Sequence, residues 1–391
     1  MMNRLKLNSN FILYLVCISA FFASLNQNIY SPIIPLIRDS FHVSVTMVNL
    51  SVSIFIFLTA MMQIVFGSLL DFKGARSVLI PSILLTVAAS ITCALTGNFT
   101  VFFISRILQA IGTAAIPLIA ATTIGRLFQG NDRGSAMGTY QMLLSVAPAA
   151  APVLGGFIGE RHGYPGVFWF LVGVSVLVLL INWLFFPGDD IDRNKTVSLK
   201  TLALHYISIF KNKVGSSVLL LSFCVFFLYF SIMVYLPVLL ADHYHLSIKI
   251  IGLLYLPMAL SLIFGSLAYK SLQAKVSFEK LLAFGNIAAS SSILLFAVAH
   301  LHTLAGTSVI LALHGIAVGM LTPLFATRIT DEFELNRGSA IGMFNFIRYM
   351  GMAAGPVVSG LLLNIAPSAL VFGAFGILFA LLSCTIFIRI R

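Results

Sequence analysis

Long apolar runs separated by short polar segments cover almost the whole chain. A helix needs about 20 apolar residues to cross the hydrocarbon core of a bilayer. We count twelve runs of about this length, and no Asp or Glu lies in the interior of any of them. The pattern therefore predicts an all-α integral membrane protein with twelve transmembrane helices. Their approximate limits are 11–33, 45–70, 77–97, 99–124, 134–158, 164–187, 215–240, 248–269, 279–299, 303–327, 338–363 and 366–388.

The two halves of the chain resemble each other. Residues 133–138 read Arg-Gly-Ser-Ala-Met-Gly, and residues 337–342 repeat them with Ile in place of Met. Likewise, Tyr-Ser-Pro at 30–32 returns as Tyr-Leu-Pro at 235–237. Homologous halves of the same topology are related by a pseudo-twofold axis along the membrane normal. We therefore expect two pseudo-symmetric six-helix bundles, residues 1–187 and 215–391, joined by a polar cytoplasmic linker, residues 188–214.

Composition supports the membrane class and narrows the function. The 391 residues are 59% apolar and only 9% charged, whereas about 25% of the residues of a soluble domain are charged. The net charge of +11 does not indicate nucleic acid, because the basic residues lie in short loops. The four Cys lie inside apolar runs and show neither disulfide nor metal spacing. We expect no cofactor, metal or catalytic residue, and a monomer surrounded by membrane lipid.

The loops also predict an orientation, because Lys and Arg accumulate on the cytoplasmic side of membrane proteins. With the N-terminus inside, the inner segments hold eighteen basic residues and the outer segments hold three, Arg38, Arg161 and Lys249. Both termini and the linker are therefore expected in the cytoplasm. The first apolar run has no obvious cleavage site for a signal peptidase and is interpreted as a retained span. A bacterial inner or plasma membrane is the expected location.

Three motifs carry a resemblance to a known family. The loop after the second run has Gly67, Asp71, Gly74 and Arg76, and the fourth run carries Arg106-x-x-Gln109-x-x-Gly112. Residues 151–156 read Ala-Pro-x-x-Gly-Gly. Together they resemble the signature loop, the Arg-x-x-Gln-Gly-x-Gly element and the Gly-Pro-x-x-Gly-Gly element of the major facilitator superfamily. The last element is typical of its twelve-span drug–proton antiporter branch, so the resemblance implies export. Many such exporters have an Asp near the end of the first span, where this chain has Asn26, Gln27 and Asn28.

The resemblance also implies two structural devices. A carboxylate is stabilised near a helix N-terminus, so Asp71, Gly74 and Arg76 are expected to form a conformational latch with the helix that starts at Arg337; alternatively, Asp71 caps its own turn. Small residues allow helices to approach closely, which could seal the transport path against proton leak or serve ordinary packing. The residues assigned to this packing are Pro152, Gly155, Gly156, Gly355 and Pro356.

Ionisable residues at membrane depth are functional candidates by default, and the runs hold three: Arg106, His314 and Arg348. Arg106 shares a helix face with Gln109 and is expected to face the bundle interior rather than to reach the outer interface. Arg348 shares a face with Asn345 and Tyr349 and is assigned to substrate contact or gating, with a purely structural role as the alternative. His314 is the candidate for proton coupling, because its pKa lies near neutrality; a core histidine bonded to a neighbouring helix is the alternative.

These residues lead to a functional prediction. A path that holds two Arg, one His and no carboxylate suits neutral or anionic small molecules, such as drugs, carboxylate metabolites or siderophores. The substrate-binding candidates are Asn28, Tyr30, Arg106, Gln109, Tyr235, Asn345, Arg348 and Tyr349. The chain has no phosphate-binding loop, so the proton gradient is the expected driver. An uptake symporter or facilitator is the first alternative. A membrane enzyme is the second, with Asp242, His243 and His245 as its one candidate cluster.

Overall fold

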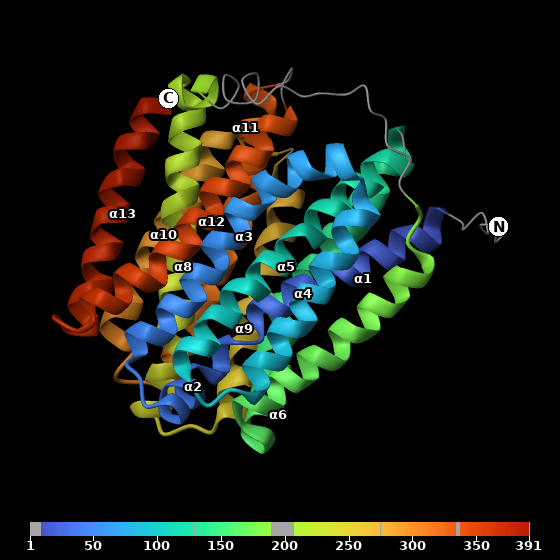
Figure 1. The fold of residues 1–391 in the computed structure, drawn as a ribbon. Helices are drawn as coiled ribbons and strands as arrows, with labels where there is room; N and C mark the ends of the chain where they lie inside the picture. The colour runs from blue at the N-terminus through green and yellow to red at the C-terminus, as the bar shows by residue number, and fades with distance from the viewer. Residues whose placement is uncertain (1–8, 129, 189–206, 274, 334–336, 391) are drawn as a thin grey trace, which may run out of the picture. The chain divides into compact units, whose positions relative to one another are not determined.

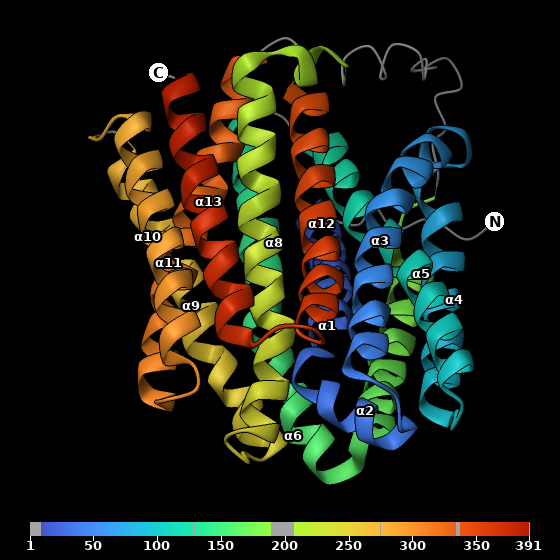
Figure 2. The ribbon, with the colours of Figure 1, turned by 90° about the vertical axis from the view of Figure 1, so that its left-hand side faces the viewer.

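The structure is a computed structural model that describes residues 9–128, 130–188, 207–273, 275–333 and 337–390 (Figures 1 and 2). Within helices, the side chains at 67–68, 71–72, 130–135, 137–138, 141–142, 145, 330, 337–339 and 390 are not described. The described part is helical throughout and contains no strand. Its elements are α1 (Ser9–Asn28), η1 (Ser31–Ile33), α2 (Ile34–Phe41), α3 (Val45–Lys73), α4 (Ala75–Leu95), α5 (Phe99–Leu127), α6 (Gly130–Phe185), α8 (Lys213–Asp242), α9 (Ile248–Leu272), α10 (Phe278–Ala299), α11 (Leu304–Glu332), α12 (Arg337–Leu362) and α13 (Ser368–Ile390).

Ten of the described helical segments are long and apolar enough to cross a membrane, so the protein is a multi-span membrane protein. The difference from twelve predicted spans has two sources. The fifth and sixth predicted spans both lie in α6, where Gly163 breaks the helical backbone with φ 64 and ψ −170. Helix α12 corresponds to the eleventh span, but Asn345, Arg348 and Tyr349 lower its hydropathy.

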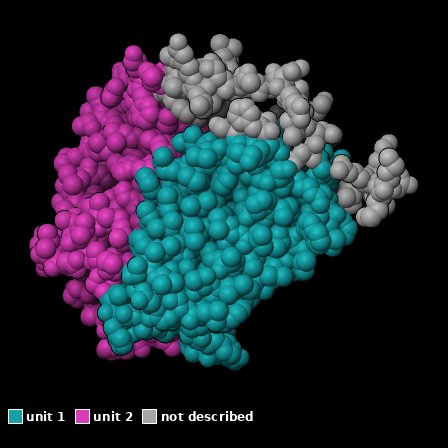
Figure 3. All heavy atoms as spheres, in the orientation of Figure 1, with its two compact units in different colours: residues 1–43, 54–196 teal, residues 44–53, 197–391 magenta. Residues whose placement is uncertain are grey.

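The described helices form two compact units (Figure 3). Unit 1 comprises residues 1–43 and 54–196, and unit 2 comprises residues 44–53 and 197–391. Of the predicted linker 188–214, residues 189–206 lie outside the described residues. The end of that segment is ordered as a helix start, because the Asn212 side chain accepts hydrogen bonds from the backbone N–H groups of Val214 and Gly215 at 2.8 and 2.9 Å.

Each unit repeats the same pairing of helices. In unit 1, α1 packs on α6 and α5, and α4 packs on α5 and α6. In unit 2, α8 packs on α12 and α11, and α10 packs on α11 and α13, as the internal repeat predicts for these helices (Figure 2). Helix α9 packs on α11 as well. Since α5 and α11 are the fourth helices of the repeats, they hold corresponding positions in the cores of their units.

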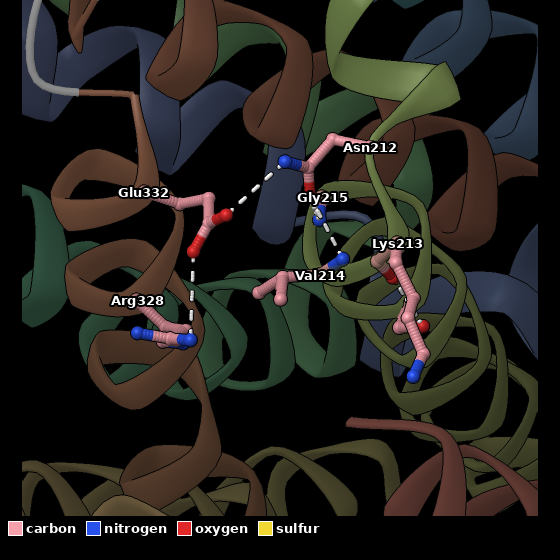
Figure 4. Close-up of polar contacts among 7 residues, drawn as sticks. Asn212, Lys213, Val214, Gly215, Arg328 and Glu332 are labelled. Atoms are coloured by element: carbon pink, nitrogen blue, oxygen red, sulfur yellow. Dashed lines mark hydrogen bonds and ion pairs between the residues drawn. The ribbon is translucent and has the colours of Figure 1, made fainter. Parts of the chain in front are cut away.

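A polar network joins the start of α8 to the end of α11 in unit 2 (Figure 4). Asn212 Nδ2 donates to Glu332 Oε1 at 3.1 Å, and Glu332 Oε2 pairs with Arg328 Nη2 at 3.4 Å. The Arg328 guanidinium lies 5.3 Å from the centre of the Phe278 ring. The side chain that caps α8 thus also holds the carboxylate at the end of α11, which fixes the two helix ends to each other.

Candidate functional site

Arg106 occupies the core of unit 1. Its side chain is only 1% exposed, and its guanidinium carbon lies 4.3 Å from the centre of the Phe55 ring, 4.6 Å from Tyr30 and 6.0 Å from Phe168. Four segments of the unit supply these groups: α3, the turn after α1, α5 and α6. Cation–π attraction to desolvated rings contributes about 2 kcal/mol or more. The arginine is therefore held by aromatic faces, and no ion pair to it is found among the described residues.

Gln109 links this arginine to the next helix. Its Oε1 accepts a hydrogen bond from Arg106 Nη1, and its Nε2 donates to Ser90 Oγ of α4 at 2.8 Å. Ser90 in turn donates to the Thr86 carbonyl at 2.7 Å. The Arg106 Nε atom has no hydrogen-bond partner among the described residues. A buried cation with a donor to spare suits an anionic or polar ligand, since an unsatisfied buried donor costs about 1–3 kcal/mol.

Two substrate-binding candidates, Asn28 and Tyr30, lie at the end of α1 and in the turn after it. Tyr30 is 2% exposed and contacts the Arg106 guanidinium. Asn28 is 7% exposed, and its Nδ2 donates to the Ser24 carbonyl at 2.7 Å. Asn26, two residues earlier, is fully buried with no partner for either side-chain polar atom among the described residues. The structure thus brings Tyr30, Arg106 and Gln109 together, while the Asn28 amide nitrogen is engaged by its own helix.

His314 lies in the core of unit 2 and is 1% exposed. Its Nδ1 is 2.9 Å from Ser292 Oγ of α10, and its ring is stacked on Tyr229 of α8 with the planes 18° apart and the centres 6.2 Å apart. The second nitrogen, Nε2, has no partner among the described residues. One side of the imidazole is therefore fixed, and the other presents an unused nitrogen to the interior of the unit.

Arg348 of α12 is partly exposed. Its guanidinium carbon lies 5.2 Å from the centre of the Phe226 ring of α8, 5.4 Å from Tyr349 and 6.0 Å from Phe344. Its Nε also has no partner within the described part of the chain, and Asn345 is partly exposed one turn away. Like Arg106, this arginine is held by aromatic faces and retains a donor that a ligand can use.

Tyr235 occupies a different setting from its repeat counterpart, Tyr30. Its ring lies 5.9 Å from His300 and 5.1 Å from Phe372, measured between ring centres. The His300 imidazole is fully buried, with Nδ1 2.8 Å from the Phe296 carbonyl and Nε2 2.7 Å from Ser368 Oγ. Tyr235 thus belongs to a group that joins the ends of α8 and α10 to the start of α13.

The latch residues are only partly described. The side chains of Asp71 and Arg337 lie outside the described residues, so their contact stays a prediction. Gly74 precedes α4 with φ 82, a backbone conformation that favours glycine. Arg76 Nη1 donates to the Phe186 carbonyl at 2.6 Å, and its Nη2 donates to the Trp183 carbonyl. These carbonyls lie at the end of α6, where a cation stabilises the helix dipole.

The glycines singled out for packing lie where two helices touch. A methyl group at Gly155 of α6 would collide with the Ile29 carbonyl, and one at Gly355 of α12 would collide with the Phe227 carbonyl. Pro152, Gly156 and Pro356 are also buried. The motif therefore allows backbone-to-backbone contact between the first and fifth helices of each repeat.

Sequence reasoning missed the groups that complete these clusters, namely Phe55, Phe168, Ser90 and Ser292. Each lies in an apolar run that contains other Phe or Ser residues, and only the tertiary contacts distinguish it. The helical spacing of Arg106 and Gln109 was the one local signal that identified a real contact, since residues three apart share a helix face.

Comparison with known proteins identifies the family. The sequence profile described as Major Facilitator Superfamily matches residues 16–277 and 218–391. The structure is similar to that of a bacterial homologue of the human lysosomal transporter Spinster in an inward-facing and unoccupied conformation, with a TM-score of 0.80 over 98% of each chain. The sequences of the two proteins are 14% identical. At this identity the similarity concerns the fold alone, and it confirms the predicted all-α fold.

Two curated relatives match part of the sequence. Citrate exporter 1 of Aspergillus niger is 31% identical over 175 residues, which cover 43% of this chain and 33% of the exporter. A chloramphenicol resistance protein of Pseudomonas aeruginosa is 28% identical over 172 residues, which cover 44% of this chain and 41% of that protein. The chain therefore spans less than half the length of each of these relatives.

Proposed function

Because the chain belongs to the Major Facilitator Superfamily, we propose that it is a secondary transporter that exports neutral or anionic small organic molecules in exchange for protons, by alternating access. This assignment makes it a transporter and not an enzyme. The names of the citrate exporter and the chloramphenicol resistance protein support export of an anion or of a neutral drug. We further propose that it acts as a monomer with both termini in the cytoplasm.

One observation carries the proposed cargo class. The ionisable side chains in the interior of the apolar runs are Arg106, His314 and Arg348, and none is a carboxylate. Both arginines are held by aromatic rings and retain an Nε without a partner within the described part of the chain. Arginine binds carboxylates and phosphates through paired donors, whereas a lipophilic cation would be repelled. We therefore assign Arg106 and Arg348, with Gln109, Tyr30, Asn345 and Tyr349, to substrate contact.

Transport by the purified protein in liposomes tests this cargo class. We expect a pH gradient to drive citrate or chloramphenicol against the direction of proton flow, and ethidium not to be transported. Arg348→Ala should lower citrate transport at least tenfold, about the effect of losing one charge-assisted hydrogen bond. Lys270→Ala, which removes an exposed cation at the end of α9, is the control. Ethidium transport that Arg348→Ala does not change would contradict the proposal.

His314→Gln tests proton coupling separately. A glutamine amide can keep the hydrogen bond to Ser292 but cannot carry a proton. We expect the ratio of transport with the pH gradient to transport without it to fall to about one, while exchange of labelled for unlabelled substrate continues. If the ratio stays at its wild-type value, another group carries the proton.

A facilitator or an uptake symporter remains the second candidate function. The specific observation in its favour is the lack of a carboxylate in the interior of the apolar runs, since carboxylates serve many transporters as proton carriers. Counterflow in vesicles separates the candidates. Movement of substrate along with protons identifies a symporter, and no response to the gradient identifies a facilitator.

A further inference from the structure

Ser292 of α10 touches two groups at once. Its hydroxyl oxygen lies 2.8 Å from the Ala289 carbonyl in its own helix and 2.9 Å from His314 Nδ1 of α11. The side chain is 2% exposed, so water does not replace either contact. Since a hydroxyl has one proton to donate and can accept as well, the position of this single proton decides which nitrogen of the imidazole carries hydrogen.

Two arrangements are possible, and they differ in the number of hydrogen bonds. If the hydroxyl donates to Ala289, His314 Nδ1–H donates to the hydroxyl oxygen, and both contacts are hydrogen bonds. If the hydroxyl donates to Nδ1 instead, the contact with the Ala289 carbonyl is lost, and the proton on Nε2 becomes a buried donor without a partner. The first arrangement makes two bonds, and the second makes one. The first arrangement therefore predominates in a buried site.

We propose that Ser292 is a positioning residue that holds neutral His314 in the Nδ1–H form, so that Nε2 is the atom that accepts the coupling proton. The proposal rests on the proposed role of His314 in proton coupling. One proton adds to the Nε2 lone pair and gives an imidazolium with both N–H bonds intact. The bond from Nδ1 to Ser292 is the same before and after, so protonation requires no rearrangement of α10 against α11.

The groups around the imidazole are consistent with this assignment. Helix α8 contributes the Tyr229 ring stacked on it. Tyr255 of α9 lies near Tyr229, and its hydroxyl donates to the Met233 carbonyl. Helix α10 contributes Ser292, and Arg348 of α12 contacts Phe226 of α8. None of the ion pairs found in the described part of the chain involves His314. The Ala289 carbonyl also faces the imidazole. Ser292 is therefore the side chain that, next to this carbonyl, distinguishes the two nitrogens.

Nitrogen NMR of protein labelled with ¹⁵N at its eight histidines tests the proposal directly, because protonated and unprotonated ring nitrogens have well-separated shifts. The signals of His314 are those lost in His314→Gln. At about pH 8, where a histidine of ordinary pKa is neutral, we expect wild-type His314 to show Nδ1 protonated and Nε2 unprotonated. In Ser292→Ala, the ratio of the two forms should fall roughly threefold to tenfold, the equivalent of one hydrogen bond.

Two further variants separate positioning from packing. Ser292→Thr keeps the hydroxyl. It should show the wild-type nitrogen signals of His314 and the wild-type gradient-driven transport. Ser290→Ala removes a buried hydroxyl of the same helix, which is bonded to the Asn286 carbonyl, and should leave His314 unchanged. A wild-type spectrum with Nε2 protonated, or one that Ser292→Ala does not alter, would overturn the proposal. Either result leaves the transport test of His314→Gln unaffected, so the two hypotheses fail separately.

Discussion

Units 1 and 2 have different polar residues at the same position of the fourth helix of their repeats. Gln109 and His314 are each the eleventh residue of their helices, α5 and α11. Each reaches a serine of the preceding helix in its repeat, Ser90 of α4 or Ser292 of α10. In unit 1 the free end of Gln109 accepts from Arg106, whereas the eighth position of α11 is Leu311. The Nε2 of His314 is therefore left without a partner among the described residues.

The difference concerns the kind of charge that each polar group can carry. An arginine stays charged at any physiological pH, so Arg106 gives unit 1 a permanent positive charge. A histidine gains and loses a proton far more readily than an arginine does, so His314 gives unit 2 a charge that a proton can switch. We infer that both units attract the substrate, through Arg106 and Arg348, and that the response to the pH gradient depends on the second unit.

Arg106→Leu gives unit 1 the side chain that unit 2 has at the corresponding position. We expect citrate transport in liposomes to fall at least about tenfold, because the guanidinium is the charged donor of the site. The melting temperature in detergent should stay the same or rise, since a buried charge without an acidic partner is costly and an apolar replacement is often neutral or stabilising.

Arg106→Met is the control for volume, because its unbranched chain fits the space between the Tyr30 and Phe55 rings. It should behave like the leucine variant in both assays. A fall of more than about 10 °C in both variants would show that the arginine holds the unit together and would remove the reason to place it in the transport path.

Gln109→His gives unit 1 the side chain that unit 2 has at the other matched position, His314, and has a smaller expected effect. The new imidazole would lie beside the Arg106 guanidinium, and a like charge nearby disfavours protonation. We expect transport to fall severalfold, while the ratio measured with and without the pH gradient stays at the wild-type value. A change in that ratio would mean that a histidine at this position of either unit can couple protons, and the assignment of the pH response to unit 2 would be wrong.

Glycine-to-alanine changes test where the two units agree. Gly155→Ala and Gly355→Ala each push a methyl group against a backbone carbonyl of the neighbouring helix. Each should cost about 1–3 kcal/mol of stability, as overpacking does, measured by thermal unfolding. Gly173→Ala in α6 has open space around it and should be neutral or stabilising by up to about 1 kcal/mol. Equal effects at all three positions would refute the packing role.

The fold follows from the sequence because its signals are long. A run of about 20 apolar residues has one stable solution in lipid, a helix whose backbone groups bond internally. The repeat of residues 133–138 at 337–342 was visible for the same reason. The break at Gly163 inside α6 was less visible, since it depends on one backbone conformation, with φ 64, rather than on a pattern.

The clusters were predictable only in part. Arg106 and Gln109 are three residues apart, so helical geometry alone places them together. Ser292 and His314 are 22 residues apart on different helices, and nothing in the local sequence selects Ser292 over its neighbour Ser290. The role of Tyr235 beside His300 was missed for the same reason, because ring contacts between helices leave no periodic signal.

The smallest effect concerns the second pair of matched positions, Tyr30 and Tyr235. Tyr30 faces the permanent charge of Arg106, whereas Tyr235 faces His300, which can titrate. Burial is the main cause that lowers the pKa of His300 below its usual value, and the neighbouring His243 and His302 add to it.

Since the pKa of His300 is lower in the folded protein, the unfolded chain binds more protons at acidic pH, and stability falls as pH drops below about 6.5. We expect the melting temperature to decline between about pH 6.5 and pH 5, and His300→Gln to flatten that decline. His162→Gln, at an exposed position away from this group, is the control and should keep the wild-type slope. If the melting temperatures of all three proteins decline equally with pH, the loss of stability in acid arises outside this group. Unit 2 then owes its pH sensitivity to other residues.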